Sequence, residues 1–433
     1  MTRPRTARRS RVSVDPAPAQ PGPADSARLL TRPILVVLAV VGFGWVAEAI
    51  IAPTLPTLIL DRGGDAVVVG LVTAAYAIPS LALRPFIGRR LDRSGSRRIH
   101  RAGAAIIAAA PLSYVLPGIV VLGVGRLVHG LGWAMFSSAN NALVARLAPA
   151  ARRGEASGYF NVMWAVGFLF GPPLGITLYG ALGEEAPFIA AAGFAMVALL
   201  LVGAVPPLVA HRAPARPASG DDRPEPSGSR GSRRLIDRYL EPAAVPTMLI
   251  TMFFMSGQTL FVAFAPVYAR SIGAPLADLW LYYPLLGLLQ AGGLLVLGRT
   301  SDRIGRRRTV TLAALLGIVG LAIALLPFGL TSLTIGAAWF VLASSLATPA
   351  TTAATMDEAP PHRLGAAMAT FSMGYQLASG LGGLLWGFTI GTLGFPAPFA
   401  IAIGLVLASL LLAGRHLPSR RAELARRASE ALG

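Results

Sequence analysis

Twelve long apolar segments, separated by short polar breaks, dominate the sequence. A helix needs about 20 apolar residues to cross the hydrocarbon core of a bilayer, and these segments are too long and unbroken for the alternating strands of a membrane β-barrel. Charged residues make up only 13% of the chain, about half the share typical of soluble domains. We therefore expect an all-α polytopic membrane protein. The predicted spans are 34–58, 67–87, 99–116, 118–145, 156–181, 186–208, 244–268, 276–297, 309–326, 331–354, 364–391 and 396–414.

The arginines predict the orientation of these spans. The chain contains no lysine, so all 38 residues counted as Lys or Arg are arginine. Twelve spans place both chain ends on one side, which then carries 34 arginines, whereas the other side carries only Arg62 and Arg270. Because positive charge marks cytoplasmic loops, we expect a multi-pass protein of the cell inner (plasma) membrane with both termini in the cytoplasm. The net charge of +18 then reflects topology and argues against a nucleic-acid partner, which would need this charge on one soluble domain.

An internal repeat recurs at an offset of 210 residues. Gly, Arg, Asp, Arg, Gly, Arg and Arg of segment 88–98 return in segment 298–308. Such a duplication predicts two six-helix bundles related by a pseudo-twofold axis along the membrane normal, with a site between them near the midplane. The other pairs at this offset are Pro56 with Pro266, Pro117 with Pro327, and Arg153 with Arg363.

Polar segments divide the chain into five predicted parts. A disordered basic cytoplasmic tail and a cytoplasmic linker flank the first bundle, and a second cytoplasmic tail follows the second bundle. The parts are the tail 1–33, the N-terminal bundle 34–210, the linker 211–242, the C-terminal bundle 243–415 and the tail 416–433.

Four segments resemble motifs of the major facilitator superfamily. Segment 88–98 has the pattern G-x-x-x-D-R-x-G-x-R-R between the second and third spans, and Pro53-Thr-Leu-Pro56 ends the first span. Segment 126–132 is similar to R-x-x-Q-G-x-G, with His129 in place of Gln, and segment 167–175 is similar to the antiporter motif, with Ile176 in place of its final Gly. The resemblance implies the major facilitator fold, the drug–proton antiporter branch and a monomer.

The resemblance also implies a cytoplasmic latch in the loop after the second span. Gly88 and Gly95 are expected to permit tight turns, and Asp92 with Arg93 to hold the outward-facing state. The alternative is a topological anchor that holds arginine in the lipid headgroups. The predicted latch residues are Gly88, Asp92, Arg93, Gly95, Arg97, Asp302 and Arg303.

The fifth span carries a stripe of glycines. Gly167, Gly171 and Gly175 recur every four residues, so another helix can approach closely along that face, and Pro172 should kink the helix. By resemblance this antiporter-type motif limits leakage between the halves. The alternative is ordinary packing of small residues. The eleventh span repeats the spacing at Gly383, Gly387 and Gly391.

Glu48 is the one acid that lies well inside a predicted span. An ionised carboxylate in mid-membrane costs about 2.5–3.5 kcal/mol on insertion scales, so a carboxyl that can lose or gain its charge there suits proton coupling. Arg126 and His129 share one helix face at a comparable depth, so we expect Arg126 to pair with Glu48 and His129 to relay protons. The alternatives are a permanent structural ion pair and a hydrogen-bonded core histidine.

Amides and aromatic side chains within the spans are candidates for the substrate pocket. Buried amides need hydrogen-bond partners, which a substrate or another helix can supply. Contacts between helices are therefore the alternative for each of them. The predicted pocket residues are Asn140, Trp133, Asn161, Trp164, Gln258, Tyr282 and Gln376.

These patterns predict a secondary active transporter that exports a small amphipathic or drug-like compound in exchange for protons by alternating access. The alternatives are a proton symporter or facilitator of a small metabolite such as a sugar, organic acid or metallophore, and, more remotely, a non-transporting membrane receptor. We expect no enzyme, cofactor or metal site, because the chain has no cysteine, its five histidines are scattered, and no nucleophile elbow is present. The expected partners are the small-molecule substrate, protons and the lipid bilayer.

Overall fold

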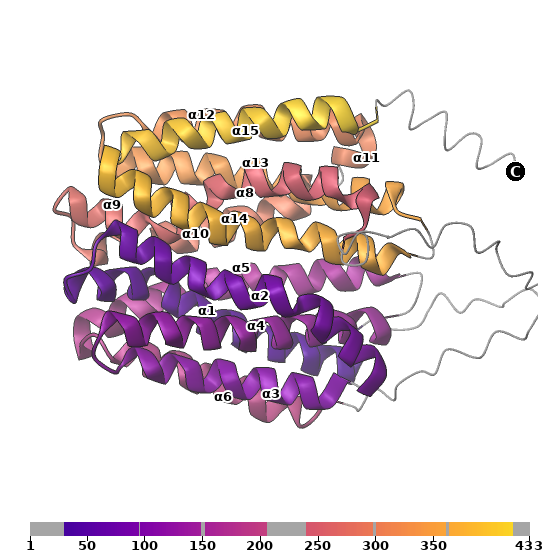
Figure 1. Ribbon diagram of the computed structural model, residues 1–433, viewed down its shortest axis with the longest axis horizontal. Helices are drawn as coiled ribbons and strands as arrows, with labels where there is room; N and C mark the ends of the chain where they lie inside the picture. Colours follow the sequence, from indigo (N-terminus) through magenta and orange to yellow (C-terminus); the bar gives the residue numbers. More distant parts are fainter. Residues whose placement is uncertain are drawn as a thin grey trace, which may run out of the picture.

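The computed structural model describes residues 30–94, 96–148, 152–205, 240–297, 300–360 and 363–418. Every regular element in these ranges is a helix. Most of the predicted tails and of the predicted linker lies outside the described residues. The helices form two groups that lie side by side with their long axes roughly parallel (Figure 1).

The first group contains the spans predicted before the linker. Its third span is split, because Pro111 cannot donate a backbone N–H and stands in the first turn of a separate 3₁₀ helix. The elements are α1 (Arg32–Asp61), α2 (Ala66–Ser94), α3 (Ser96–Ala109) with η2 (Ala110–Tyr114), α4 (Ile119–Leu147), α5 (Arg153–Leu182) and α6 (Ala186–Val202).

The second group contains the remaining spans, and its seventh and eighth spans are interrupted. The elements are η4 (Pro242–Ala244), α8 (Val245–Ala263), α9 (Ala265–Ser271), η5 (Leu276–Leu279), α10 (Tyr282–Leu297), α11 (Thr300–Ile304), α12 (Arg306–Ala324), α13 (Leu330–Glu358), α14 (Leu364–Leu393) and α15 (Pro396–His416).

Each predicted span coincides with one helix or a broken helix of the described residues, which confirms the all-α prediction of twelve spans in two sets of six. Nine helical segments in these ranges are long and apolar enough to cross a membrane. The other three spans are α3 with η2, the shorter apolar helix α6, and α14.

The turn expected at Gly88 is wrong, because Gly88 lies inside α2. One glycine costs a helix about 1 kcal/mol, and the arginines and leucine around it are good helix formers. The helix therefore continues to Ser94. In the second half the corresponding turn lies at Gly305, whose φ of +94° favours glycine. Its counterpart Gly95 lies outside the described residues.

The remaining left-handed glycines of the described residues repeat between the halves. They stand in the loops at the end of the molecule opposite the start of α1, where glycine alone takes such a φ without strain. Their pairing reflects the duplication found in the sequence. Gly63 and Gly273 are 210 residues apart, whereas Gly118 and Gly329, like Gly183 and Gly394, are 211 apart.

The two ends of the molecule differ in charge. We call the end where α1 begins and α15 ends the basic end, because the last turns of α4 and α15 there carry Arg146 and Arg415 and α12 begins there with three arginines. The opposite end holds the glycine turns and α9, at the left of Figure 1.

The main contacts between the halves are the helix pairs α2 with α14 and α5 with α10, and α1 adds smaller contacts with α8 and α9. Along the first pair the backbones nearly touch near the opposite end. A Cβ on Gly387 would lie 2.6 Å from the Ala66 carbonyl oxygen, and one on Gly380 would lie 2.8 Å from Ala77 Cβ. We call this contact the glycine seam (Gly70, Gly380, Gly383, Gly387 and Gly391).

The glycine seam predicts an efficient cross-link in this cysteine-free chain. The double variant Ala77→Cys with Gly380→Cys should form a disulfide under mild oxidation, because a small shift brings the two Cβ atoms to the usual separation of about 3.5–4.5 Å. Mass spectrometry of proteolytic fragments before and after reduction checks this. Pairing Ala77→Cys with Gly404→Cys, on the open face of α15, is the control. Equal cross-linking of both pairs would contradict the contact.

Candidate functional site

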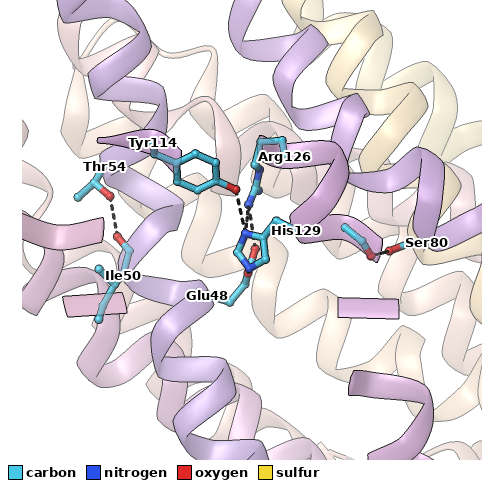
Figure 2. Close-up of polar contacts among 8 residues, drawn as sticks. Glu48, Ile50, Thr54, Ser80, Tyr114, Arg126 and His129 are labelled. Atoms are coloured by element: carbon cyan, nitrogen blue, oxygen red, sulfur yellow. Dashed lines mark hydrogen bonds and ion pairs between the residues drawn. The ribbon is translucent and has the colours of Figure 1, made fainter. Parts of the chain in front are cut away.

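Glu48 lies at the middle of α1 and contacts two side chains of α4 (Figure 2). Its Oε1 is 3.4 Å from Arg126 Nη1, and its Oε2 is 3.2 Å from His129 Nε2. The exposed fractions of the side chains are 15% for Glu48, 12% for Arg126 and 3% for His129. The structure therefore brings together all three residues that the sequence proposed for proton coupling.

The contacts of His129 determine which ring nitrogen carries its proton. Nδ1 lies 3.3 Å from Arg126 Nη1 and 2.9 Å from the Tyr114 hydroxyl. A guanidinium can only donate, so Nδ1 must accept and the proton of the neutral ring resides on Nε2. That N–H then faces the Glu48 carboxylate. His129 is neutral in this arrangement, and a proton added to Nδ1 would face the cation.

Two tyrosines that the sequence analysis did not select complete this polar cluster. The Tyr76 ring lies 4.3 Å from the guanidinium carbon of Arg126 and meets the His129 ring edge to face. Tyr114, at the end of η2, contacts Nδ1 as described. Cation–π contact and the hydroxyl both stabilise a buried cation. A tyrosine in an apolar run, whose hydroxyl needs a partner, was the signal available in the sequence.

An aromatic cluster lies about one turn along α1 and α4 from Glu48 and His129. Trp45, one turn before Glu48 on α1, contacts Trp133 of α4 at a centroid distance of 4.6 Å and Trp164 of α5 at 6.5 Å. Trp164 stacks on Phe168, which in turn contacts Tyr283 of the other half. Trp133 and Trp164 were predicted pocket residues, and Trp45 was missed. Large aromatic faces next to a charged cluster suit an amphipathic ligand.

The other predicted pocket residues are dispersed. Asn140 is buried and donates to the Phe136 carbonyl, and the buried Tyr282 hydroxyl donates to the Phe261 carbonyl. The Asn140 bond stays within α4, whereas the Tyr282 bond joins α10 to α8 of the same half. Asn161 is exposed, whereas Gln258 and Gln376 are half-buried on the second-half helices α8 and α14.

The latch prediction falls largely on side chains outside the described set. These are Asp92, Arg93 and Asp302, and Gly95 is not described at all. Arg97 donates to the Gly203 carbonyl at 3.2 Å, which ties the start of α3 to the end of α6 within the first half. Arg303 is exposed on α11. The latch therefore stays a prediction.

The glycine stripe of α5 lies against the part of α1 that carries Glu48. A Cβ on Gly167 would lie 2.8 Å from Trp45, one on Gly171 2.8 Å from the Val46 carbonyl oxygen, and one on Gly175 2.6 Å from the Ile50 carbonyl oxygen. Pro172 lies within this helix. The motif contacts a helix of its own half, so it fixes the position of α1, and its effect on leakage between the halves stays a prediction.

Charged side chains join the halves at the opposite end. Arg270 of α9 forms an ion pair with Asp61 at the end of α1, and the Tyr179 hydroxyl donates to the same carboxylate at 2.6 Å. Nearby, Arg62 pairs with Glu184 at 3.0 Å within the first half. Together with the glycine seam, these contacts hold the two halves together at the opposite end.

Comparison with known proteins assigns the chain to one family. The Major Facilitator Superfamily model matches residues 34–346 and 287–432. Multidrug resistance protein 2 of Bacillus subtilis (strain 168) is 27% identical over 38% of this chain and 41% of its own length. Multidrug resistance protein 1 of the same organism is 26% identical over 49% and 52%. The chain thus spans about half the length of these relatives.

Solved structures agree on the fold. A D-xylose-proton symporter superposes with a TM-score of 0.70 over 89% of this chain and 97% of its own, at 16% identity. At that identity the likeness concerns the fold. The matched proteins are transporters rather than enzymes.

The α5 stripe predicts a position-specific effect of added bulk. Gly171→Val should force α1 and α5 apart at Glu48 and destabilise the protein by about 1–3 kcal/mol through overpacking. Thermal unfolding in detergent measures this. Gly180→Val, on the same helix but with open space around it, should change the unfolding temperature far less. Equal effects of the two variants would contradict the close approach.

Proposed function

Because this chain belongs to the major facilitator superfamily, we propose that it is a secondary active transporter that exports a small amphipathic compound in exchange for protons. The observation that carries this proposal is the Glu48 carboxylate, held between Arg126 and His129 in the middle of α1. The basic end is the cytoplasmic side, following the rule that positive loops stay inside.

Proton binding at Glu48 changes the charge of a largely enclosed cluster. While ionised, the carboxylate balances the charge of Arg126 and lies 3.2 Å from His129 Nε2. Once protonated, it no longer balances the cation, and the ion pair loses its Coulomb attraction, which is larger in a buried site than in water. A proton entering from outside therefore loosens the contact between α1 and α4 beside the aromatic cluster and favours release of the substrate.

The contacts between the halves support alternating access. The present arrangement is closed at the opposite end by the glycine seam and the Asp61–Arg270 ion pair. Opening that end requires these contacts to separate while contacts near the basic end form, as the two halves rock about the central site. One proton moving inward supplies about 2.3 kcal/mol per 100 mV of membrane potential.

The matched relatives support efflux over uptake. Both Bacillus subtilis relatives carry the name multidrug resistance protein, and the aromatic cluster next to Glu48 fits amphipathic compounds. The D-xylose-proton symporter shares the fold at 16% identity, which gives the uptake alternative no support beyond architecture.

Glu48→Gln tests the coupling role. This variant retains the shape of the side chain but cannot ionise, so substrate should no longer dissipate an imposed proton gradient in inverted vesicles, whereas the wild type should. Glu184→Gln, which removes a half-exposed acid at the opposite end, should retain the response. Full proton-coupled movement by Glu48→Gln would overturn the proposal, and accumulation of substrate by whole cells would instead show uptake.

Two variants of His129 distinguish a role as hydrogen-bond donor from a role as proton relay. If its task is to donate Nε2–H to Glu48, His129→Gln should preserve most proton-coupled transport, because the amide N–H₂ can take the same place. His129→Leu should reduce transport by about tenfold or more through loss of a hydrogen bond to a charged group. Equal loss in both variants would favour the relay.

A further inference from the structure

Arg84 is a second arginine within the predicted spans, and it is not part of the polar cluster around Glu48. It ends the apolar stretch Ala66–Arg84 of α2. Its Nη1 donates to the Ser372 hydroxyl of α14 at 3.0 Å, and its Nε is buried without a hydrogen-bond partner. Among the described residues, Ser372 is the only side chain that bonds this guanidinium.

Among the described residues, no acidic side chain pairs with Arg84. Glu48 already pairs with Arg126, and α14, the helix that Arg84 faces, contains no acidic residue along residues 364–393. A partly buried guanidinium bound only to a hydroxyl is energetically poor, because desolvation of a charge is offset only when an anion accepts its hydrogen bonds. The site therefore favours an anion from outside the chain.

By its position along its helix, Arg84 lies nearer the basic end than Glu48 does. The glycine seam brings the backbones of α2 and α14 together near the opposite end, whereas at Arg84 a full arginine side chain spans the distance to Ser372. Arg84 lies ten residues before the end of α2, and Glu48 sixteen residues after the start of α1. At 1.5 Å per residue these are about 15 Å and about 24 Å from the basic ends of their helices.

We propose that Arg84 anchors the carboxylate of an amphipathic organic anion, whose apolar body extends toward the aromatic cluster of Trp45, Trp133 and Trp164. Arginine suits this role because its planar fork binds a carboxylate through two parallel hydrogen bonds. The inference rests on the proposed export function and adds the chemical class of the substrate. Arg84 acts as a binding residue, and the proton is handled separately at Glu48.

Equilibrium binding of three matched probes tests this assignment. Pyrenebutyrate, pyrenebutanamide and pyrenebutylammonium share one aromatic body and differ in charge, and energy transfer from tryptophan to pyrene reports their binding to the purified full chain in nanodiscs. The wild type should bind pyrenebutyrate about tenfold or more tightly than the amide, since a hydrogen bond to a charged group contributes about 1.5–3 kcal/mol.

Variants show whether Arg84 binds the probe through its charge or only supports the packing of the helices. Arg84→Gln keeps a polar side chain but carries no charge, so it should bind pyrenebutyrate and the amide equally, and Arg84→Lys should restore part of the preference. Ser372→Ala removes the hydrogen bond yet keeps the charge and should retain the preference. Arg101→Gln, an exposed arginine of α3, is the matched control and should behave as the wild type.

Several outcomes would overturn the inference. These are an unchanged carboxylate preference in Arg84→Gln, a wild type that prefers the cation, and a wild type that binds none of the probes. Competition by phosphatidylglycerol in the nanodiscs, absent with phosphatidylcholine alone, would assign Arg84 to a lipid headgroup instead. No proton gradient is used, so these results are independent of the Glu48→Gln assay: either proposal can fail while the other stands.

Discussion

A single carboxylate, enclosed between two helices and opposed by one guanidinium, is the interaction on which the rest of this molecule depends. Glu48 and Arg126 approach within 3.4 Å, and either charge alone would be costly inside a membrane. His129 and Tyr114 use their remaining hydrogen-bonding groups to hold this pair. Adding or removing one proton therefore changes the electrostatic energy of this site more than it would change that of an exposed ion pair, because the site is largely shielded from water.

Close helix packing occurs in two places, within the first half and between the halves. Within the first half, the α5 glycines let α1 approach until backbone meets backbone at Trp45, Val46 and Ile50, so Glu48 stands on a rigid segment. Between the halves, the glycine seam allows an equally close contact, but one that connects two bodies. The first contact fixes the site, whereas the proposed alternating access requires the second to separate when the opposite end opens. Small residues thus have different tasks in α5 and α14.

Much of this architecture could be predicted from the sequence, because hydrophobic length, the arginine bias and the 210-residue repeat are properties of whole segments. The pairing of Glu48 with Arg126 could be anticipated because charged residues are rare inside membranes and these two lie at similar depth.

The contacts of Tyr76, Trp45 and Tyr114 with this site could not be predicted. Which aromatic side chain of an apolar segment faces a given charge depends on how the helix is rotated, and the sequence does not give that rotation. Asn140 and Tyr282 show the converse, because an amide N–H or a hydroxyl inside a span can donate to a backbone carbonyl of its own or a neighbouring helix instead of a ligand. The turn expected at Gly88 failed because one glycine does not outweigh good helix formers around it.

Proton release on substrate binding tests the central claim most directly. Purified protein in weakly buffered detergent solution is mixed with an exported compound, and a pH-sensitive dye follows the proton. If the binding of substrate and the binding of a proton to Glu48 exclude each other, the wild type should release up to one proton per molecule and Glu48→Gln should release none. Identical release by the two proteins, or saturable binding by the wild type at every pH without any proton release, would contradict the account.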